Sequence, residues 1–108
     1  MRAKSNNAFL LNIDSKSETI IRNNQWGIGR HTSNELCLND AYVSRFHARI
    51  SRDGEQFFLE DLGSTNGTLL NSEVVTSRRP LHHGDKIRIG KSEFVFVGPG
   101  VTQAYRLS

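Results

Sequence analysis

The sequence is poor in residues that cross-link or interrupt a chain. Its 108 residues include one cysteine, Cys37, and two prolines. With a single cysteine no intrachain disulfide can form, and a lack of disulfides is typical of proteins from a reducing compartment. The apolar run at residues 8–11 is too short for the core of a signal peptide, and no stretch approaches the length of a membrane span. We therefore expect a cytoplasmic protein with no membrane partner.

A strong excess of charge is also missing. The 14 Lys and Arg residues and 11 Asp and Glu residues give a formal net charge of +3 at pH 7. This mild bias favours an anionic partner but falls short of the basic stripe of a nucleic-acid-binding protein. Nor are aromatic residues interleaved with basic ones, as a site for single-stranded nucleic acid requires. We expect no nucleic acid partner.

Helical patterning is absent, and strand patterning takes its place. No window of eleven or more residues places apolar side chains at helical spacing. Short apolar and β-branched runs lie at residues 9–13, 19–21, 26–29, 36–38, 47–50, 57–60, 68–70, 86–89 and 93–97. About ten short strands, with turn residues roughly every 8 to 12 positions, predict an all-β fold, an antiparallel β-sandwich. We expect one domain over residues 8–98, with tails at 1–7 and 99–108.

Glycine marks three predicted turns. Asp53-Gly54 predicts a hairpin between two strands, and Gly90-Lys91-Ser92 predicts a three-residue hairpin. Asn66-Gly67 is the strongest short turn signal, because both residues tolerate the positive φ of a tight hairpin. The two residues before it, Ser64-Thr65, add hydroxyl groups. This stretch has more hydrogen-bonding groups than a turn requires, which predicts that it holds a polar ligand.

Three polar segments lie where predicted strands meet loops. They are Gly29-Arg30, the run from Val43 to His47, and the run from Gly63 to Thr68. A sandwich gathers its binding loops at one end, so we expect the three segments to meet there. Together they offer guanidinium groups, hydroxyls, an amide and backbone N–H groups. These groups suit a tetrahedral oxyanion carried on a peptide.

Other chemistries fit the sequence poorly. No carboxylates converge for a hard cation, and His82-His83, with His31 and Cys37, lack the spacing of zinc ligands. Ser44 and His47 could suggest a nucleophile and its base, but residues three apart in an extended segment point to opposite faces. Nucleotide-binding glycine motifs are incomplete as well. We expect no metal, no cofactor and no enzymatic activity.

Four blocks in this order resemble the forkhead-associated (FHA) domain family. Its pattern has Gly-Arg, then Ser-Arg-x-His, then Gly-Ser-Thr-Asn-Gly-Thr with an asparagine close behind, and finally Leu-x-x-Gly-Asp-x-Ile-x-Ile-Gly before an aromatic strand. The matching segments here are Gly29-Arg30, Ser44 to His47, Gly63 to Asn71, and Leu81 to Gly90. The resemblance covers roughly residues 8–98. It implies an eleven-stranded β-sandwich that binds phosphothreonine peptides through loops at one end.

The resemblance also implies roles for individual residues. Arg30, Ser44 and Thr65 match positions that contact the phosphate, with Arg45 and Ser64 as further candidates. Asn66 matches the residue that hydrogen-bonds the peptide backbone. The remaining matched positions shape the loops, and they are Gly29, His47, Gly67 and Asn71.

The implied partner is a phosphothreonine-containing protein or peptide, such as a protein-kinase substrate. The expected function is therefore phosphorylation-dependent protein–protein interaction in kinase signalling. A phosphate-independent scaffold or oligomerisation module on the same fold is the alternative.

Overall fold

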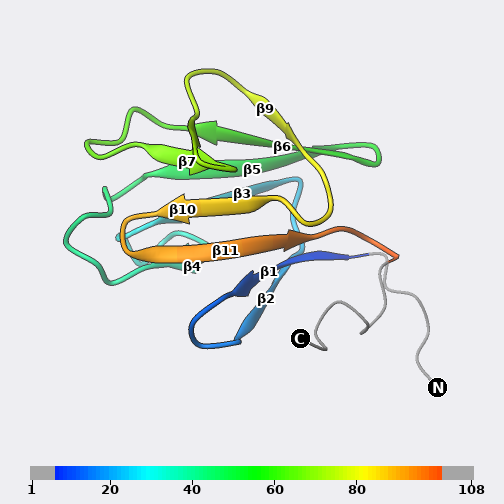
Figure 1. The fold of residues 1–108 in the computed structure, drawn as a ribbon, viewed down its shortest axis with the longest axis horizontal. Coiled ribbons are helices and arrows are strands. Elements are labelled where there is room, and N and C mark those ends of the chain that lie inside the picture. Colours follow the sequence, from blue (N-terminus) through cyan, green and yellow to red (C-terminus); the bar gives the residue numbers. More distant parts are fainter. Residues whose placement is uncertain (1–6, 101–108) are drawn as a thin grey trace.

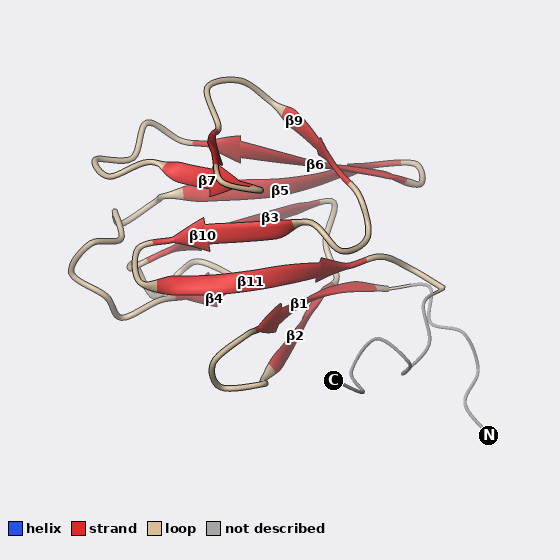
Figure 2. Cartoon of the chain, in the orientation of Figure 1, coloured by secondary structure: helices blue, strands red, loops and turns tan. Residues whose placement is uncertain are grey.

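A computed structural model describes residues 7–100 of the chain. Eleven strands form two sheets, and no helix occurs between residues 7 and 100, which confirms the predicted all-β sandwich (Figure 2). The strands are β1 (Ala8–Asn12), β2 (Glu18–Ile21), β3 (Gln25–Gly29), β4 (Leu36–Cys37), β5 (Ala48–Asp53), β6 (Gln56–Asp61), β7 (Thr68–Leu70), β8 (Glu73–Val74), β9 (Arg79–Leu81), β10 (Lys86–Ile89) and β11 (Ser92–Val97). Most of the predicted tails, at residues 1–6 and 101–108, lie outside the described residues.

The two sheets interleave strands from distant parts of the chain (Figure 1). The six-stranded sheet has the order β2-β1-β11-β10-β7-β8, and the five-stranded sheet has the order β4-β3-β5-β6-β9. Within the described residues, neighbouring strands pair antiparallel except β3 with β4, which run parallel. The predicted antiparallel β-sandwich is therefore confirmed, with one short parallel pair at an edge. The short β4 can run parallel to β3 because the loop at residues 30–35 carries the chain back before β4 begins.

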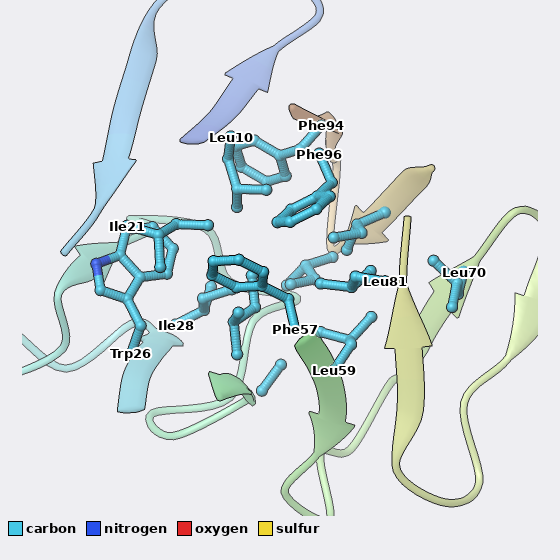
Figure 3. Close-up of a cluster of buried hydrophobic side chains, with 14 of the residues drawn as sticks. Leu10, Ile21, Trp26, Ile28, Phe57, Leu59, Leu70, Leu81, Phe94 and Phe96 are labelled. Carbon is cyan, nitrogen blue, oxygen red and sulfur yellow. The ribbon is translucent and has the colours of Figure 1, made fainter. Parts of the chain in front are cut away.

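Alternating side chains place the core between the sheets. In β10, Ile87 and Ile89 are buried, whereas Lys86 and Arg88 are exposed, as expected for a strand with one face on the core. Aromatic side chains from both sheets meet in this core: Phe57 of β6 and Phe96 of β11 have ring centroids 5.3 Å apart (Figure 3). A continuous apolar core fixes the register of the strands, because a slip of one residue would turn these side chains to solvent.

The turns differ from the predictions in two places. The hairpin at Gly54 forms as predicted, since Asp53 pairs with Gln56. The last hairpin is one residue shorter than predicted, because Ser92 pairs with Ile89. Asn66-Gly67 does not close a tight hairpin: residues 62–67 connect β6 to β7, and these strands belong to different sheets.

One segment in which the sequence predicted no strand forms an edge strand. Arg79 to Leu81 make up β9, which pairs with β6. Pro80 fits there because an edge strand leaves one side of its backbone unpaired. The preceding Arg78 is not simply solvated, since its guanidinium carbon lies 3.9 Å from the ring centroid of Phe58.

Candidate functional site

Three connections meet at one end of the sandwich. They are residues 30–35 between β3 and β4, 38–47 between β4 and β5, and 62–67 between β6 and β7. In Figure 1 the ends of β3, β6 and β10 and the starts of β5 and β7 lie on the left, where these connections emerge. Hydrogen bonds join the three connections to one another. All the site residues predicted from the sequence lie at this end except Asn71.

Arg30 follows β3 and is exposed at this end. Its backbone N–H donates to the carbonyl of Ser44 at 3.0 Å, and its side-chain Nε donates to the carbonyl of Val43 at 3.0 Å. These bonds fix the plane of the guanidinium group. Its two terminal nitrogens have no hydrogen-bond partner among residues 7–100. Arg30 therefore presents two free donors in a fork suited to an oxyanion.

Gly29 allows two of the connections to approach closely. A Cβ atom at this position would lie 2.2 Å from the backbone oxygen of Arg45. That oxygen accepts hydrogen bonds from the N–H of His31 at 3.1 Å and from Nδ2 of Asn34 at 2.8 Å. Glycine is thus needed for space, and its φ is not in the positive range. The side chain of Arg45 is exposed and makes no hydrogen bond or ion pair within residues 7–100.

His47 joins the connection 38–47 to the connection 62–67. Its ring is fully buried. Nδ1 accepts a hydrogen bond from the backbone N–H of Ser44 at 3.0 Å, and Nε2 lies 2.8 Å from the carbonyl oxygen of Gly67. Because Nδ1 accepts, the proton is on Nε2, which donates to Gly67. The ring contacts the backbone of Ser44 rather than its hydroxyl, so the pair is not arranged as a nucleophile and its base.

Ser44 and Thr65 lie side by side. The hydroxyl oxygen of Ser44 accepts a hydrogen bond from the backbone N–H of Thr65 at 3.0 Å. The Ser44 hydroxyl proton and the whole Thr65 hydroxyl have no hydrogen-bond partner within the described chain. Two hydroxyl groups therefore remain free to donate beside Arg30, which is bonded to Ser44 through its backbone.

Asp61 organises the connection 62–67, a role that the sequence analysis missed. One carboxylate oxygen accepts from the N–H groups of Gly63 and Ser64 at 3.0 and 2.9 Å. The other accepts from the hydroxyls of Ser64 and Thr68 at 2.6 and 2.7 Å. Burial tends to raise the pKa of Asp61, but the hydrogen bonds from Ser64, Thr68 and Gly63 outweigh it and hold the pKa below its ordinary value. An Asp two and three residues before small turn residues is a recognisable signal for such backbone capping.

Ser64 has less freedom than the predicted phosphate-binding role requires. Its hydroxyl donates to Asp61 and accepts from the N–H of Gly67 at 2.9 Å, and its own N–H also donates to Asp61. Both of its donors are therefore engaged within the connection. Asn66 differs, because only its Nδ2 is engaged, with the carbonyl of Tyr42 at 2.9 Å. Its amide oxygen accepts no hydrogen bond within residues 7–100.

Asn71 lies away from the other predicted residues. It follows β7 at the end opposite to residues 62–67, where its Nδ2 donates to Asp85 at 3.0 Å and its Oδ1 accepts from the N–H of Lys86 at 2.9 Å. With a φ of 50°, it shapes the turn from β7 to β8. Asn71 therefore braces a turn at the far end of β7 and does not lie in the connection 62–67.

The chemistry of the loop end is that of an anion site. The unused donors are the terminal nitrogens of Arg30, the guanidinium of Arg45 and the hydroxyl protons of Ser44 and Thr65. The amide oxygen of Asn66 is an unused acceptor, and the nearby carboxylate of Asp61 already accepts four hydrogen bonds. Within residues 7–100 no three His, Cys, Asp or Glu side chains group in a way that could hold a metal ion. The same residues include no helix with the length and apolar character of a membrane span.

Comparison with known proteins identifies similar chains. The family model described as the FHA domain matches residues 26–90. A relative from Corynebacterium jeikeium, named oxoglutarate dehydrogenase inhibitor, is 45% identical over 69 residues, which are 64% of this chain and 47% of the relative. The chain thus spans less than half the length of that relative.

Two solved structures have a similar fold. Mycobacterium tuberculosis EmbR, in complex with a low-affinity phosphopeptide, aligns with a TM-score of 0.86 at 35% identity, covering 91% of this chain and 26% of EmbR. A second structure, from work on phosphothreonine-dependent FHA domain interactions, aligns with a TM-score of 0.79 at 37% identity, covering 84% of this chain and 95% of the other.

Proposed function

Because the chain belongs to the FHA domain family, we propose that its loop end binds phosphothreonine in partner proteins. In this role the domain mediates phosphorylation-dependent protein–protein interaction in kinase signalling. Two similar structures support the proposal, since one is a complex with a phosphopeptide and the other comes from work on phosphothreonine-dependent interactions. The partner is then a phosphothreonine-containing protein, such as a protein-kinase substrate.

The observation that carries the proposal is the state of Arg30. Its Nε is fixed on the carbonyl of Val43, while its terminal nitrogens are free and exposed. An arginine held in this way has lost conformational freedom before a ligand arrives, so less entropy is lost on binding. A phosphate dianion accepts two parallel hydrogen bonds from such a fork.

The unused hydrogen-bonding groups at the loop end contact different parts of a phosphopeptide. Arg30, Ser44 and Thr65 bind the phosphate oxygens, and Arg45 adds a second positive charge near them. Asn66 binds the peptide backbone through its amide oxygen. We assign Ser64 to the support of the loop instead, because Asp61 and Gly67 engage its hydroxyl.

Substitution of Arg30 tests the proposal. A charge-assisted hydrogen bond contributes roughly 1.5–3 kcal/mol, so Arg30→Ala should weaken phosphothreonine-peptide binding by about 10- to 150-fold. Isothermal titration with a phosphorylated peptide and its unphosphorylated twin measures the effect. Arg22→Ala removes the same charge from an exposed residue at the end of β2 and should leave the affinity unchanged.

The same titration distinguishes phosphothreonine binding from the alternative, a phosphate-independent scaffold or oligomerisation module. Tyr42 and Phe46 favour that alternative, because their side chains are 53% and 49% exposed at the same end of the domain. Equal affinity for the two peptides would support it and contradict phosphothreonine recognition. Unfolding of the Arg30→Ala variant would show instead that Arg30 has a structural role.

We further propose that the domain, residues 8–98, acts by binding and not by catalysis, and that it works in the cytoplasm. A relative named as an inhibitor supports a binding role. The lone free thiol of Cys37 is consistent with a reducing compartment. Assay of the purified domain with and without a phosphothreonine peptide would detect any phosphate release, which this proposal does not expect.

A further inference from the structure

The turn from Asp40 to Val43 orients two of the side chains that we assign to the ligand. A hydrogen bond from the N–H of Val43 to the carbonyl of Asp40, at 3.0 Å, closes this turn. The carbonyl of Tyr42 accepts from Nδ2 of Asn66 at 2.9 Å. The next carbonyl along the chain, that of Val43, accepts from Nε of Arg30 at 3.0 Å. One turn therefore fixes both the side chain for the peptide backbone and the side chain for the phosphate.

The carboxylate of Asp40 fastens this turn to a neighbouring hairpin. One oxygen accepts from the N–H of Tyr42 and the other from the N–H of Lys91, both at 2.8 Å. Lys91 lies between β10 and β11, in a hairpin that Figure 1 shows at the loop end. These two backbone bonds, first that from Lys91, hold the pKa of Asp40 below its ordinary value. Asp40 is therefore a carboxylate at neutral pH, with an acceptor for each of the two donors.

The turn and the hairpin also pack closely against each other. A Cβ atom on Gly90 would lie 2.6 Å from Oδ2 of Asp40 and 2.6 Å from Cγ2 of Val43. The side chain of Val43 is buried. Gly90 has a φ of 60°, so a side chain here would be strained as well as crowded. The hairpin is thus a fixed support against which Asp40 holds the turn.

We propose that Asp40 is a positioning residue for the phosphopeptide site, because it holds the turn that orients Arg30 and Asn66. The inference rests on the proposed function and adds a residue that acts through these two side chains. Immobilising a freely rotating side chain on binding weakens affinity by about two- to twelvefold. Asp40 reduces that loss by fixing the two carbonyl acceptors before the ligand arrives.

The direction of the effect separates positioning from electrostatics. Asp40 brings a negative charge to the loop end, where it repels a phosphate. Coulomb repulsion alone therefore predicts that removing this charge strengthens binding of the dianion. Positioning predicts the opposite, a weaker complex.

Asp40→Asn tests the inference. The amide accepts through its oxygen but donates through its nitrogen, so it keeps at most one of the two bonds. We expect a phosphothreonine peptide to bind about 3- to 30-fold more weakly, as measured by isothermal titration at neutral pH. Asp53→Asn is the matched control. It removes the same charge from an exposed residue at the end of β5 and should bind as wild type does.

Nitrogen-15 NMR of the ligand-free protein observes the two held side chains directly. In Asp40→Asn the Nε–H signal of Arg30 and the Nδ2 signals of Asn66 should shift and exchange faster with solvent. The N–H of Gly63, which is bonded to Asp61, should keep its signal. A merely structural role for Asp40 would lower stability and leave both side-chain signals of the folded protein unchanged.

A double-mutant cycle tests whether Asp40 acts through Asn66. Asp40→Asn should weaken binding less in an Asn66→Ala background than in wild type, because that background has already lost one of the positioned contacts. In an Arg45→Ala background the full effect should remain, since the turn does not hold the Arg45 side chain. Equal effects in the two backgrounds would contradict action through Asn66.

Gly90→Ala is a second variant that approaches the same contact from the hairpin, and it decides the matter if Asp40→Asn does not fold. Its Cβ would push the hairpin away from Asp40, so the signals of Arg30 and Asn66 should change in the same way. Binding that is unchanged or stronger in Asp40→Asn would overturn the inference. So would weaker binding with both side-chain signals unchanged.

These results are distinct from failure of the proposed function. If wild-type protein binds phosphorylated and unphosphorylated peptides equally, the proposed function fails and the role of Asp40 in binding fails with it. If binding depends on the phosphate but is equal in wild type and Asp40→Asn, only the positioning role falls.

Discussion

Hydrogen bonding separates the polar residues of the loop end into engaged and free groups. His47, Ser64 and Asp61 have their polar atoms satisfied inside the protein. Arg30 and Thr65 keep donors that no described residue uses. Substitutions in the first group should therefore lower stability, whereas substitutions in the second should lower affinity alone.

Thr65→Val tests this separation at a single hydroxyl. Valine keeps the shape of threonine and removes its free donor, while the backbone N–H that bonds to Ser44 remains. We expect phosphothreonine-peptide affinity to fall by about 10- to 150-fold, the effect of one hydrogen bond to a charged group. Calorimetric titration and a urea unfolding curve should show loss of affinity with unchanged stability. Thr76→Val, at an exposed threonine between β8 and β9, should change neither.

Much of the site could be predicted from the sequence because its residue types and order are specific. Arg30, Ser44, Thr65 and Asn66 were expected to meet at one end, and hydrogen bonds join the segments that carry them. The central position of Asp61 was not predicted. Its role depends on four donors that reach it only when residues 63–68 fold back. The spacing of Asp61 before small turn residues indicates the local capping, but it does not show that the carboxylate also reaches Thr68.

At the level of elements, the connection 62–67 matters because it passes between the sheets. Asp61 ends β6 in one sheet, and its bond to Thr68 reaches the first residue of β7 in the other. One carboxylate thus sets the path of the connection on which Thr65 and Asn66 lie. The ionised state suits this role, since a carboxylate accepts through both oxygens and has no donor that would face the four N–H and O–H groups.

Asp61→Asn should make this role measurable. The amide NH₂ cannot accept from the N–H groups of Gly63 and Ser64, so we expect a loss of about 1–3 kcal/mol in the free energy of unfolding at neutral pH. The folded-state pKa of Asp61 is below its ordinary value of 3.8. Its stabilising effect is therefore complete above that value and is lost as the pH falls through the lower folded-state pKa.

Urea unfolding between about pH 2 and pH 7 checks both parts of this expectation. The difference in stability between wild type and Asp61→Asn should be largest at neutral pH and should shrink at the acidic end. A difference that stays constant down to pH 2 would contradict the assignment of Asp61 as the charged acceptor.

Gly29→Ala tests the close approach of two connections. The added Cβ would meet the backbone oxygen of Arg45 at 2.2 Å, so the segment carrying Ser44 must move away from Arg30. We expect a loss of roughly 1–3 kcal/mol in stability together with weaker peptide binding. Gly98→Ala is the matched control, because its Cβ would find only ordinary contacts, the nearest at 3.6 Å. Equal urea midpoints for the two variants would refute a steric requirement at Gly29.

Sequence patterns missed β8 and β9, which are among the shortest strands and, unlike the equally short β4 and β7, contain no apolar run. β8 has two residues and β9 has three, too few for alternation to be visible. Their pairing is decided by tertiary contacts, such as Pro80 opposite Phe58. The turn at Asn66-Gly67 was misjudged for a related reason. A local sequence cannot tell a hairpin from a connection between sheets, since both use glycine at positive φ.

For the whole molecule, the pH dependence of binding should follow the ligand. The second ionisation of a phosphate ester lies near pH 6, so affinity should rise as the pH increases through about that value. The net charge of +3 at pH 7 attracts a phosphate dianion more strongly than a monoanion. Calorimetric titration between about pH 5 and pH 7.5 measures this rise. His31→Gln, at the loop end, should keep it, whereas a flat profile would argue against dianion recognition.

The pairing of the first strand with the last has a mechanical consequence. β1 and β11 are antiparallel neighbours, with Phe9 opposite Val97, so the two ends of the domain emerge next to each other. In Figure 1 they emerge on the right, away from the loop end. Tension applied through segments attached at both ends would peel β1 from β11 one hydrogen bond at a time instead of shearing the ladder. The domain would yield first along this seam, while residues 30–67 and their ligand, held by other strands, would bear little of the force.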